Sequence, residues 1–482
     1  MSTTTIWAPE RRVLTLGLLG LVTAVAFEGM AVPTVLPATV HELGGLELYG
    51  WAFSAFFLTN IVGVTLAGSD ADRHGPRRSF LVGLILFAAG LAISGLAPTM
   101  PMVIAGRTVQ GFGAGAIGSI VYAVIARAYP PTVMARMIAM LSSAWVVPGL
   151  VGPALAGLVA DHLDWRWVFL GLIPPVAVLG GFVLGPVGRI GPAGGLAGEG
   201  RREPTAERRR RAVAAVLLAA GSTLLLAGLS LRDPILAALP LVVGGGWLAA
   251  VTLRRLVPPG TLRAEKGRPA VFALIFLVAF GFFGTEAFVP LAVTDVRGSS
   301  TTVGGLALSA AAVTWALGAW LPARLTAVTR RGITAVGALG ILLGIGVVAL
   351  VLLPSMPVAT AAAGWAIAGL GMGLAYSTLT WLVLQTAPAG SEGVSSAALQ
   401  LMFTLGTAIG AGVAGALVAT AEGASLGLGA AIGWADLVML LVMLVALASS
   451  RRLPAGAAPG AALPLEAAAA SPAGSMTGYD ES

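Results

Sequence analysis

Long apolar stretches, separated by short polar or basic segments, dominate the pattern of residues along this chain. A helix needs about 20 apolar residues to span the hydrocarbon core of a bilayer. The stretches lack the strict alternation of apolar and polar residues that a membrane β-barrel requires, so they predict helices. The sequence therefore indicates an all-α membrane protein with fourteen transmembrane helices, expected at residues 13–37, 49–68, 79–97, 102–128, 135–160, 165–188, 212–231, 235–256, 270–294, 301–326, 333–353, 358–386, 393–420 and 428–450.

Basic segments divide these helices into groups of six, two and six. The first segment is rich in glycine before it becomes strongly basic, and the second follows two further apolar stretches. After the last stretch the chain is mostly Ala, Pro and Gly, a composition that buries little apolar surface and is expected to stay disordered. The expected order is a six-helix bundle over 1–188, a cytoplasmic linker over 189–211, two inserted helices over 212–256, a linker over 257–269, a six-helix bundle over 270–450 and a cytoplasmic tail over 451–482.

Composition excludes a soluble protein, because only 10% of the residues are charged and 57% are hydrophobic, whereas soluble domains carry about 25% charged residues. If the chain crosses the membrane fourteen times, nearly all of the 28 Lys and Arg residues fall in segments on the same side of the membrane. Arg166, Arg232 and Arg297 fall outside them, and Arg107 lies within a helix. This bias predicts a multi-pass protein of the inner (cytoplasmic) membrane with both termini in the cytoplasm. The net charge of +7 is thus explained without a nucleic-acid partner.

The residues that usually bind metals are scarce. The chain has no cysteine, and its three histidines, His41, His74 and His162, fall in different loops, which disfavours a metal site. The phosphate-binding pattern GxxxxGK[ST] is missing too, which disfavours an ATP-driven pump. We expect no enzyme activity, no metal and no cofactor, with the proton as coupling ion and a monomer in the bilayer.

Two glutamates lie at matching depth in helices that begin the two groups of six. Glu28 is followed by Pro33, and Glu286 is followed by Pro290. Matching depth is expected if the groups are parallel repeats that share a central site. Because a low-dielectric interior disfavours the charged form of a carboxyl group, either residue could exchange a proton near neutral pH. Asp436 is a third acidic residue at membrane depth, although its position is equally compatible with the outer interface.

The loop after the second helix reads GSDADRHGPRR. It resembles the signature GxLaDRxGrr of the major facilitator superfamily. A short loop needs glycine for its tight geometry, and an aspartate beside arginines can form charge-assisted bonds that latch helix ends. The sequence departs from the signature at Asp70 and Pro76. The matching residues, for which the resemblance implies a gating role, are Gly68, Asp72, Arg73, Gly75, Arg77 and Arg78.

The fourth apolar stretch carries AGRTVQGFGAG, which resembles the family's helix-4 motif RxxqGxgaa. An arginine inside a membrane helix costs roughly 2.5 to 3.5 kcal/mol on insertion scales, so a partner or a water-filled cavity is expected for Arg107. The alternative is that Arg107 extends to the outer interface. Gln110 would offer a neutral hydrogen bond nearby.

The fifth stretch, WVVPGLVGPALAG, resembles the motif gxxxGPxxGG that the family associates with antiport. The match rests on Gly152, Pro153 and Gly157, with Ala156 in place of a glycine. Small residues permit close helix approach, and proline permits bending. The string from Glu28 to Pro37 resembles the helix-1 motif of the fourteen-helix drug:proton antiporters. This resemblance implies that 212–256 is the inserted pair of that branch.

Together these features predict a proton-coupled antiporter that exports small amphipathic drugs or metabolites, cationic or zwitterionic, by alternating access. Glu28, Glu286 and Arg107 would carry the coupling. The alternatives are an exporter or flippase-like transporter of lipids or of an endogenous metabolite, and a proton-coupled uptake symporter. The residues expected around the substrate are Asn60, Gln110, Phe27, Phe56, Phe57, Phe282, Phe283, Trp315 and Asp436.

Overall fold

A computed structural model describes residues 6–191, 205–231, 235–325, 328–388, 391–423 and 426–454, and all regular structure in these ranges is helical. Thirteen helical spans in this part of the chain are long and apolar enough to cross a membrane. The expected all-α membrane fold is therefore confirmed. Arg232, most of the expected linker 189–211 and most of the tail 451–482 lie outside the described residues.

The first group of helices follows the expected spans closely. The fifth and sixth spans are each divided into two helices, and the second break, at Gly171 and Leu172, comes just before Pro174 and Pro175. Proline lacks an N–H group and restricts the preceding residue, so it starts a helix more easily than it continues one. The helices are α1 (Pro9–Leu43), α2 (Tyr49–His74), α3 (Pro76–Gly95), α4 (Met100–Ala128), α5 (Pro131–Ser143), α6 (Val146–His162), α7 (Arg166–Leu170) and α8 (Ile173–Val187).

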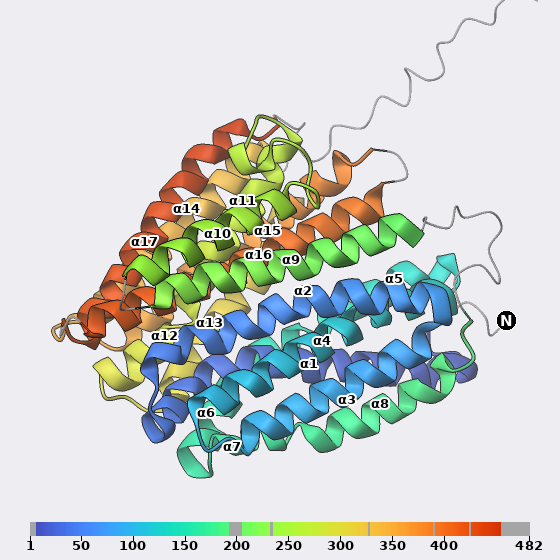
Figure 1. Ribbon diagram of the computed structural model, residues 1–482, viewed down its shortest axis with the longest axis horizontal. Helices are drawn as coiled ribbons and strands as arrows, with labels where there is room; N and C mark the ends of the chain where they lie inside the picture. Colours follow the sequence, from blue (N-terminus) through green and yellow to red (C-terminus); the bar gives the residue numbers. More distant parts are fainter. Residues whose placement is uncertain are drawn as a thin grey trace, which may run out of the picture.

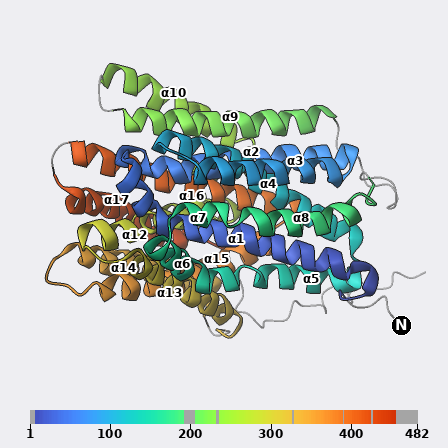
Figure 2. The same ribbon diagram turned by 90° about the horizontal axis from the view of Figure 1, so that it is seen from below.

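The inserted pair consists of α9 (Thr205–Ser230) and α10 (Ile235–Leu253), which pack against each other. The apolar helix in the second member runs over Ala237–Leu253 and is shorter than the thirteen long spans. Figure 2 shows α9 and α10 along one side of the bundle. The expected span at 235–256 is thus present as a shorter helix that packs on α9.

The last group begins with α11 and ends with α17. A π-helical turn, Ala292–Val296, continues the chain beyond Pro290, where the missing proline N–H interrupts the regular helix. The helices are α11 (Arg268–Glu286), α12 (Val289–Leu291), α13 (Thr301–Trp320), α14 (Arg330–Ala349), α15 (Ala359–Gln385), α16 (Glu392–Gly423) and α17 (Leu428–Ser449).

Helix pairs in the last group repeat those in the first. The contacts of α4 with α2 and α3 reappear as contacts of α15 with α13 and α14, and those of α1 with α6 and α8 reappear as those of α11 with α16 and α17. Glycines set the close approaches in both groups: a Cβ on Gly111 would collide with the Phe56 carbonyl oxygen, and one on Gly369 with that of Ala311. The two groups meet where α2 contacts α16 and where α6 contacts α13.

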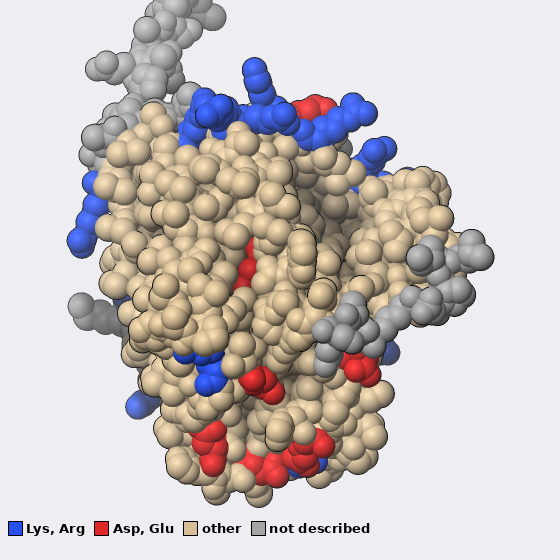
Figure 3. All heavy atoms as spheres, turned by 90° about the vertical axis from the view of Figure 1, so that its left-hand side faces the viewer, with Lys and Arg blue, Asp and Glu red and all other residues tan. Residues whose placement is uncertain are grey.

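Charge distinguishes the two ends of the bundle. The end where α1 and α6 finish carries Glu42, Glu47, Asp161 and Asp164, and we call it the acidic end. The end where α2 and α4 finish and α9 begins is rich in arginine, and we call it the basic end. Figure 3 shows acidic side chains on the lower part of the face in view and basic side chains along its upper rim. α9 lies between α2 and α16 in Figure 1 and contacts both.

Candidate functional site

A buried ion pair joins α1 to α4. Arg107 Nη1 donates to Glu28 Oε1 and, over 2.9 Å, to Gln110 Oε1, while its Nε donates to the Ala52 carbonyl oxygen at 3.1 Å. Its guanidinium carbon lies 4.1 Å from the ring centre of Phe56. The Arg107 side chain is 2% exposed, so it does not extend to the interface. Such a pair is tolerated in a low-dielectric interior only when the charges are matched and hydrogen-bonded.

Two atoms of this network are left without partners. Glu28 Oε2 and Gln110 Nε2 are both buried and form no hydrogen bond within the described residues. Buried polar atoms are normally satisfied, and these two are an acceptor and a donor beside a fixed positive charge. The network can therefore accept a proton or a further polar ligand at Glu28 Oε2.

The corresponding carboxyl group in the second group of helices has a different partner. Trp365 Nε1, on α15, donates to Glu286 Oε2, at the end of α11, over 3.3 Å. In the described part of the chain no Lys or Arg forms an ion pair with Glu286. In both pairs 79 residues separate the partners along the chain. The repeat thus places a tryptophan where the first group has an arginine.

Aromatic rings surround the Glu286 region. Phe282 stacks on Trp365 with ring centres 4.6 Å apart and meets Trp315 edge to face at 5.5 Å. The sequence predicted Phe282, Phe283 and Trp315, and the structure brings them together. The structure adds three aromatic residues that the sequence prediction missed, Trp365, Tyr376 and Phe403. Of these, Trp365 could have been found by aligning the two repeats.

Other predicted cavity residues lie apart from these pairs. Phe27 faces Gly152 of α6, and Phe57 meets Phe56 edge to face at 5.2 Å. Asn60 lines a cavity of about 1380 Å³ beneath α9, and no hydrogen bond within the described residues joins it to Glu28 or Arg107. Sequence alone could not resolve which face of α2 the Asn60 side chain occupies.

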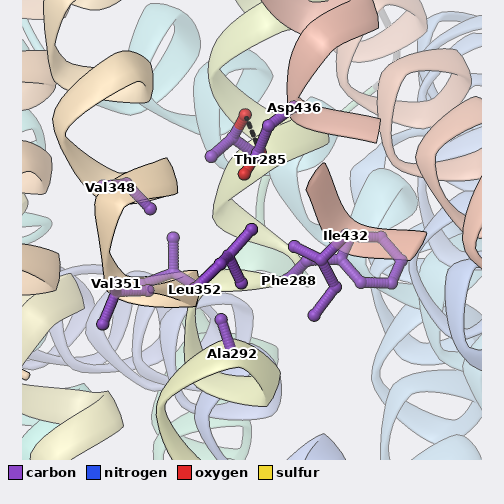
Figure 4. Close-up of a pocket in the computed structure, with 9 residues that line it drawn as sticks. Thr285, Phe288, Ala292, Val348, Val351, Leu352, Ile432 and Asp436 are labelled. Atoms are coloured by element: carbon purple, nitrogen blue, oxygen red, sulfur yellow. Dashed lines mark hydrogen bonds between the residues drawn. The ribbon is translucent and has the colours of Figure 1, made fainter. Parts of the chain in front are cut away.

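Asp436 lies inside the bundle and not at the outer interface, since it is 3% exposed. Thr285 Oγ1 donates to its Oδ1 over 3.2 Å. Figure 4 shows both side chains at a crevice whose apolar wall includes Val348 and Leu352. The crevice has no room for a water molecule. In this conformation Asp436 therefore meets neither solvent nor a substrate-sized space.

The expected gating loop contains an ion pair between two helix ends. Asp72 was expected to form charge-assisted bonds that latch helix ends, and it pairs with Arg127 at the end of α4, whose Nη2 lies 2.7 Å from Asp72 Oδ1. A short turn joins α2 to α3 directly after this pair. In that turn Gly75 has a φ of +87°, in the left-handed region that favours glycine. Gly68 lies on α2 beside Ser119 and lines the cavity beneath α9.

The departing residue Asp70 also has a clear role. Ser79 Oγ donates to Asp70 Oδ2 over 2.5 Å, and Asp70 Oδ1 lies 2.8 Å from His74 Nδ1. These bonds tie the end of α2 to the beginning of α3. The acidic residue that replaces the family's leucine is thus a second latch in the same loop.

The predicted antiport motif on α6 faces the other group of helices. A Cβ on Gly157 would lie 2.6 Å from Thr302 Cα, and one on Gly305 would collide with the Pro153 carbonyl oxygen. Gly152 faces Phe27 within its own group instead. Gly157 of the motif and Gly305 on α13 therefore let α6 and α13 approach closely.

An aspartate that the prediction missed fastens the same interface. Asp161 Oδ1 accepts from the Thr301 N–H at 3.0 Å, and its Oδ2 accepts from the Thr302 N–H at 2.8 Å and from the Thr302 hydroxyl at 2.6 Å. These groups form the N-terminus of α13, whose unpaired N–H groups and dipole favour a negative charge. The sequence signal for this contact was an acidic residue at the end of α6 together with two threonines at the start of α13.

Further contacts close the acidic end between the two groups of helices. Ser54 Oγ donates to the Ala408 carbonyl oxygen at 2.7 Å, and Tyr49 Oη donates to that of Ala287 at 3.0 Å. No group of three or more His, Cys, Asp or Glu residues that could hold a metal ion occurs in the described ranges.

Comparisons with known proteins place these features in context. The family model described as Major Facilitator Superfamily matches residues 17–411. A probable multidrug-efflux transporter of Mycobacterium tuberculosis is 29% identical over 81% of this chain and 84% of its own length. A multidrug transporter protein of Bacillus subtilis is 27% identical over 86% of this chain and 76% of its own.

Solved structures agree on the fold. The crystal structure of a bacterial homolog of the human lysosomal transporter Spinster, in an inward-facing and unoccupied conformation, matches with a TM-score of 0.64. The match covers 92% of this chain and 98% of that one at 14% identity. At this identity the likeness concerns the fold alone.

Proposed function

Because the chain belongs to the Major Facilitator Superfamily and is a multi-pass membrane transporter, not an enzyme, we propose that it exports small amphipathic drugs or metabolites in exchange for protons. The observation that carries this proposal is the pair of carboxyl groups at equivalent places in the two repeats, one beside Arg107 and the other beside Trp365. Two relatives whose names describe multidrug transport support the substrate class, and the one named for efflux also supports the direction.

The two carboxyl groups have different tasks in this proposal. Glu286 has an indole N–H and aromatic rings as neighbours, and it has no cation partner within the described residues. A cationic or zwitterionic amphiphile would place its positive charge beside this carboxylate and its apolar part against the rings. Glu286 therefore binds the substrate's charge.

Glu28 carries the coupling proton. Its Oε2 is free to take a proton, and protonation would remove the negative charge that Arg107 faces. The cost of a buried, unmatched guanidinium would then favour a rearrangement in which Arg107 finds water or another partner. Proton binding thus biases the relative position of α1 and α4, both in the first six-helix group.

Alternating access would move the two six-helix groups against each other. Contacts between the groups close the acidic end, while a large cavity lies between α2 and α16 at the basic end. If the basic end faces the cytoplasm, as the positive-inside rule predicts, this arrangement is an inward-facing state. We propose that both termini lie in the cytoplasm and that the protein resides in the inner membrane as a monomer.

Everted membrane vesicles that have been acidified by respiration test the direction and the coupling together. Addition of a cationic dye should raise the internal pH, because an antiporter moves protons out of the lumen as it moves substrate in. The Glu28→Gln and Glu286→Gln variants should abolish this response at equal expression. A fall in internal pH on dye addition would identify a symporter, and an unchanged response in both variants would refute the carboxylate mechanism.

A further inference from the structure

The cavity of about 1380 Å³ at the basic end is bounded by both six-helix groups and by the inserted pair. α2 and α16 form its facing walls, and α9 with the end of α10 covers it from the side. Nearer the acidic end α9 closes onto its neighbours: Trp51 Nε1 donates to Ser230 Oγ over 3.3 Å, and Leu226 is buried. The cavity therefore lies along the half of α9 that begins the helix.

The mouth of this cavity has an excess of positive charge. Its two carboxylates already have arginine partners, since Asp72 pairs with Arg127 and Glu207 lies 3.4 Å from Arg211. Four further guanidinium groups have no ion pair within the described residues, and Nε of one of them, Arg208, is buried without a hydrogen-bond partner. These four line the cavity together: Arg208, Arg209, Arg210 and Arg255.

Beyond these arginines much of the cavity lining is apolar, with polar residues such as Asn60, Gln400 and Thr404 among it. Val64 on α2, Val213 and Leu217 on α9, and Val394 on α16 form part of this apolar lining, and their side chains are 37%, 48%, 37% and 54% exposed. A small soluble anion would satisfy the arginines but would leave this surface uncovered. An amphiphile with a negatively charged head and long apolar chains would satisfy both parts.

We propose that an acidic phospholipid from the leaflet at the basic end occupies this cavity, with its phosphate among Arg208, Arg209 and Arg255 and its acyl chains against α2, α9 and α16. Basic pockets between transmembrane helices on the cytoplasmic side are suited to such headgroups. Because α2 and α16 belong to different six-helix groups, the bound lipid spans both. It stabilises the conformation in which the basic end is open, and closing that end requires it to leave.

Binding can be measured on the full-length protein in neutral detergent by native mass spectrometry, with phosphatidylglycerol and phosphatidylcholine as probes. The wild type should bind phosphatidylglycerol in preference. The variant Arg208→Gln/Arg209→Gln/Arg255→Gln should bind it about a hundredfold more weakly, at roughly fivefold per arginine. The control variant Arg12→Gln/Arg136→Gln/Arg324→Gln removes three exposed arginines that do not line the cavity and should bind as the wild type does.

A second variant distinguishes binding of the whole lipid from binding of its headgroup alone. It also keeps the proposal testable if the triple variant fails to fold. Val213→Trp keeps every arginine but fills the apolar part, so it should weaken phosphatidylglycerol binding and leave binding of glycerol phosphate unchanged. Equal binding of the two lipids, or equal losses in the arginine and control variants, would overturn the proposal. So would glycerol phosphate that competes as well as the intact lipid. If the arginine variant binds phosphatidylglycerol as the wild type does but no longer exports acidic amphiphiles, the proposal is also overturned, and the cavity is instead a route for substrate.

Discussion

Arg107 on α4 and Trp365 on α15 hold equivalent positions in the two six-helix groups, and each donates to the glutamate 79 residues away from it in the chain. One glutamate therefore has a cation for a neighbour and the other an indole. The repeat preserves the geometry of the contact and changes its charge. That difference makes the two carboxyl groups chemically distinct and yields separate predictions for each.

Removing Arg107 should be costly to stability as well as to transport. Arg107→Gln leaves the buried Glu28 without its cation, and loss of one partner of a buried ion pair costs about 3 to 5 kcal/mol. We expect a clear fall in the thermal unfolding temperature in detergent. The double variant Glu28→Gln/Arg107→Gln removes both charges and should recover most of the stability but no proton-coupled transport. A double variant as unstable as Arg107→Gln would show that the pair is not what stabilises the site.

Replacing Trp365 by arginine should change substrate selection. Trp365→Arg gives Glu286 the kind of partner that Glu28 has, so a cationic dye would compete with a fixed guanidinium. We expect loss of cationic dye export, measured by fluorescence in whole cells, with export of neutral compounds retained. Trp365→Phe is the control: it keeps the ring against Phe282 but removes the N–H donor, and it should lower cationic dye export only several-fold. Full cationic export by Trp365→Arg would refute the assignment of Glu286.

Asp161 should hold the acidic end closed. Asp161→Asn removes the negative charge from the N-terminus of α13, an interaction worth about 0.3 to 1 kcal/mol at exposed sites, and shifts the population toward a state open at that end. Spin labels on introduced cysteines near the acidic ends of α6 and α13 would report longer distances. The chain has no cysteine of its own, so spin labels would attach only to the introduced cysteines.

Asp164 provides the matched control for that measurement. It lies at the same end, but it accepts from Arg166 N at 2.8 Å within the same group of helices. Asp164→Asn should leave the distances as they are in the wild type. Equal shifts in the two variants would assign the effect to net charge and not to the contact across the interface.

Gly157 should tolerate no side chain. In Gly157→Ala the new Cβ would lie 2.6 Å from Thr302 Cα, so α6 and α13 would have to separate. We expect transport to fall at least tenfold at unchanged expression. Gly181 on α8 has nothing within 4 Å of an added Cβ, and Gly181→Ala should transport normally. Normal transport by Gly157→Ala would mean that the interface adjusts without cost.

The local pattern of apolar residues determined much of this protein. A bilayer leaves an unpaired backbone no water to bond with, so an apolar stretch of sufficient length must be a helix. Glu28, Glu286, Arg107 and the glycine motif on α6 could be recognised for the same reason, because a charge or a run of small residues is conspicuous in an apolar helix.

Only the tertiary structure decided which side chains meet. The direction of each side chain depends on the rotation and crossing of helices, and packing between helices sets these. Hence the pairing of Asp72 with Arg127, the Trp365 partner of Glu286, the Asp161 contact and the cavity beneath α9 could not be read from hydropathy. Each joins segments far apart in sequence, where local patterns carry no information on distance.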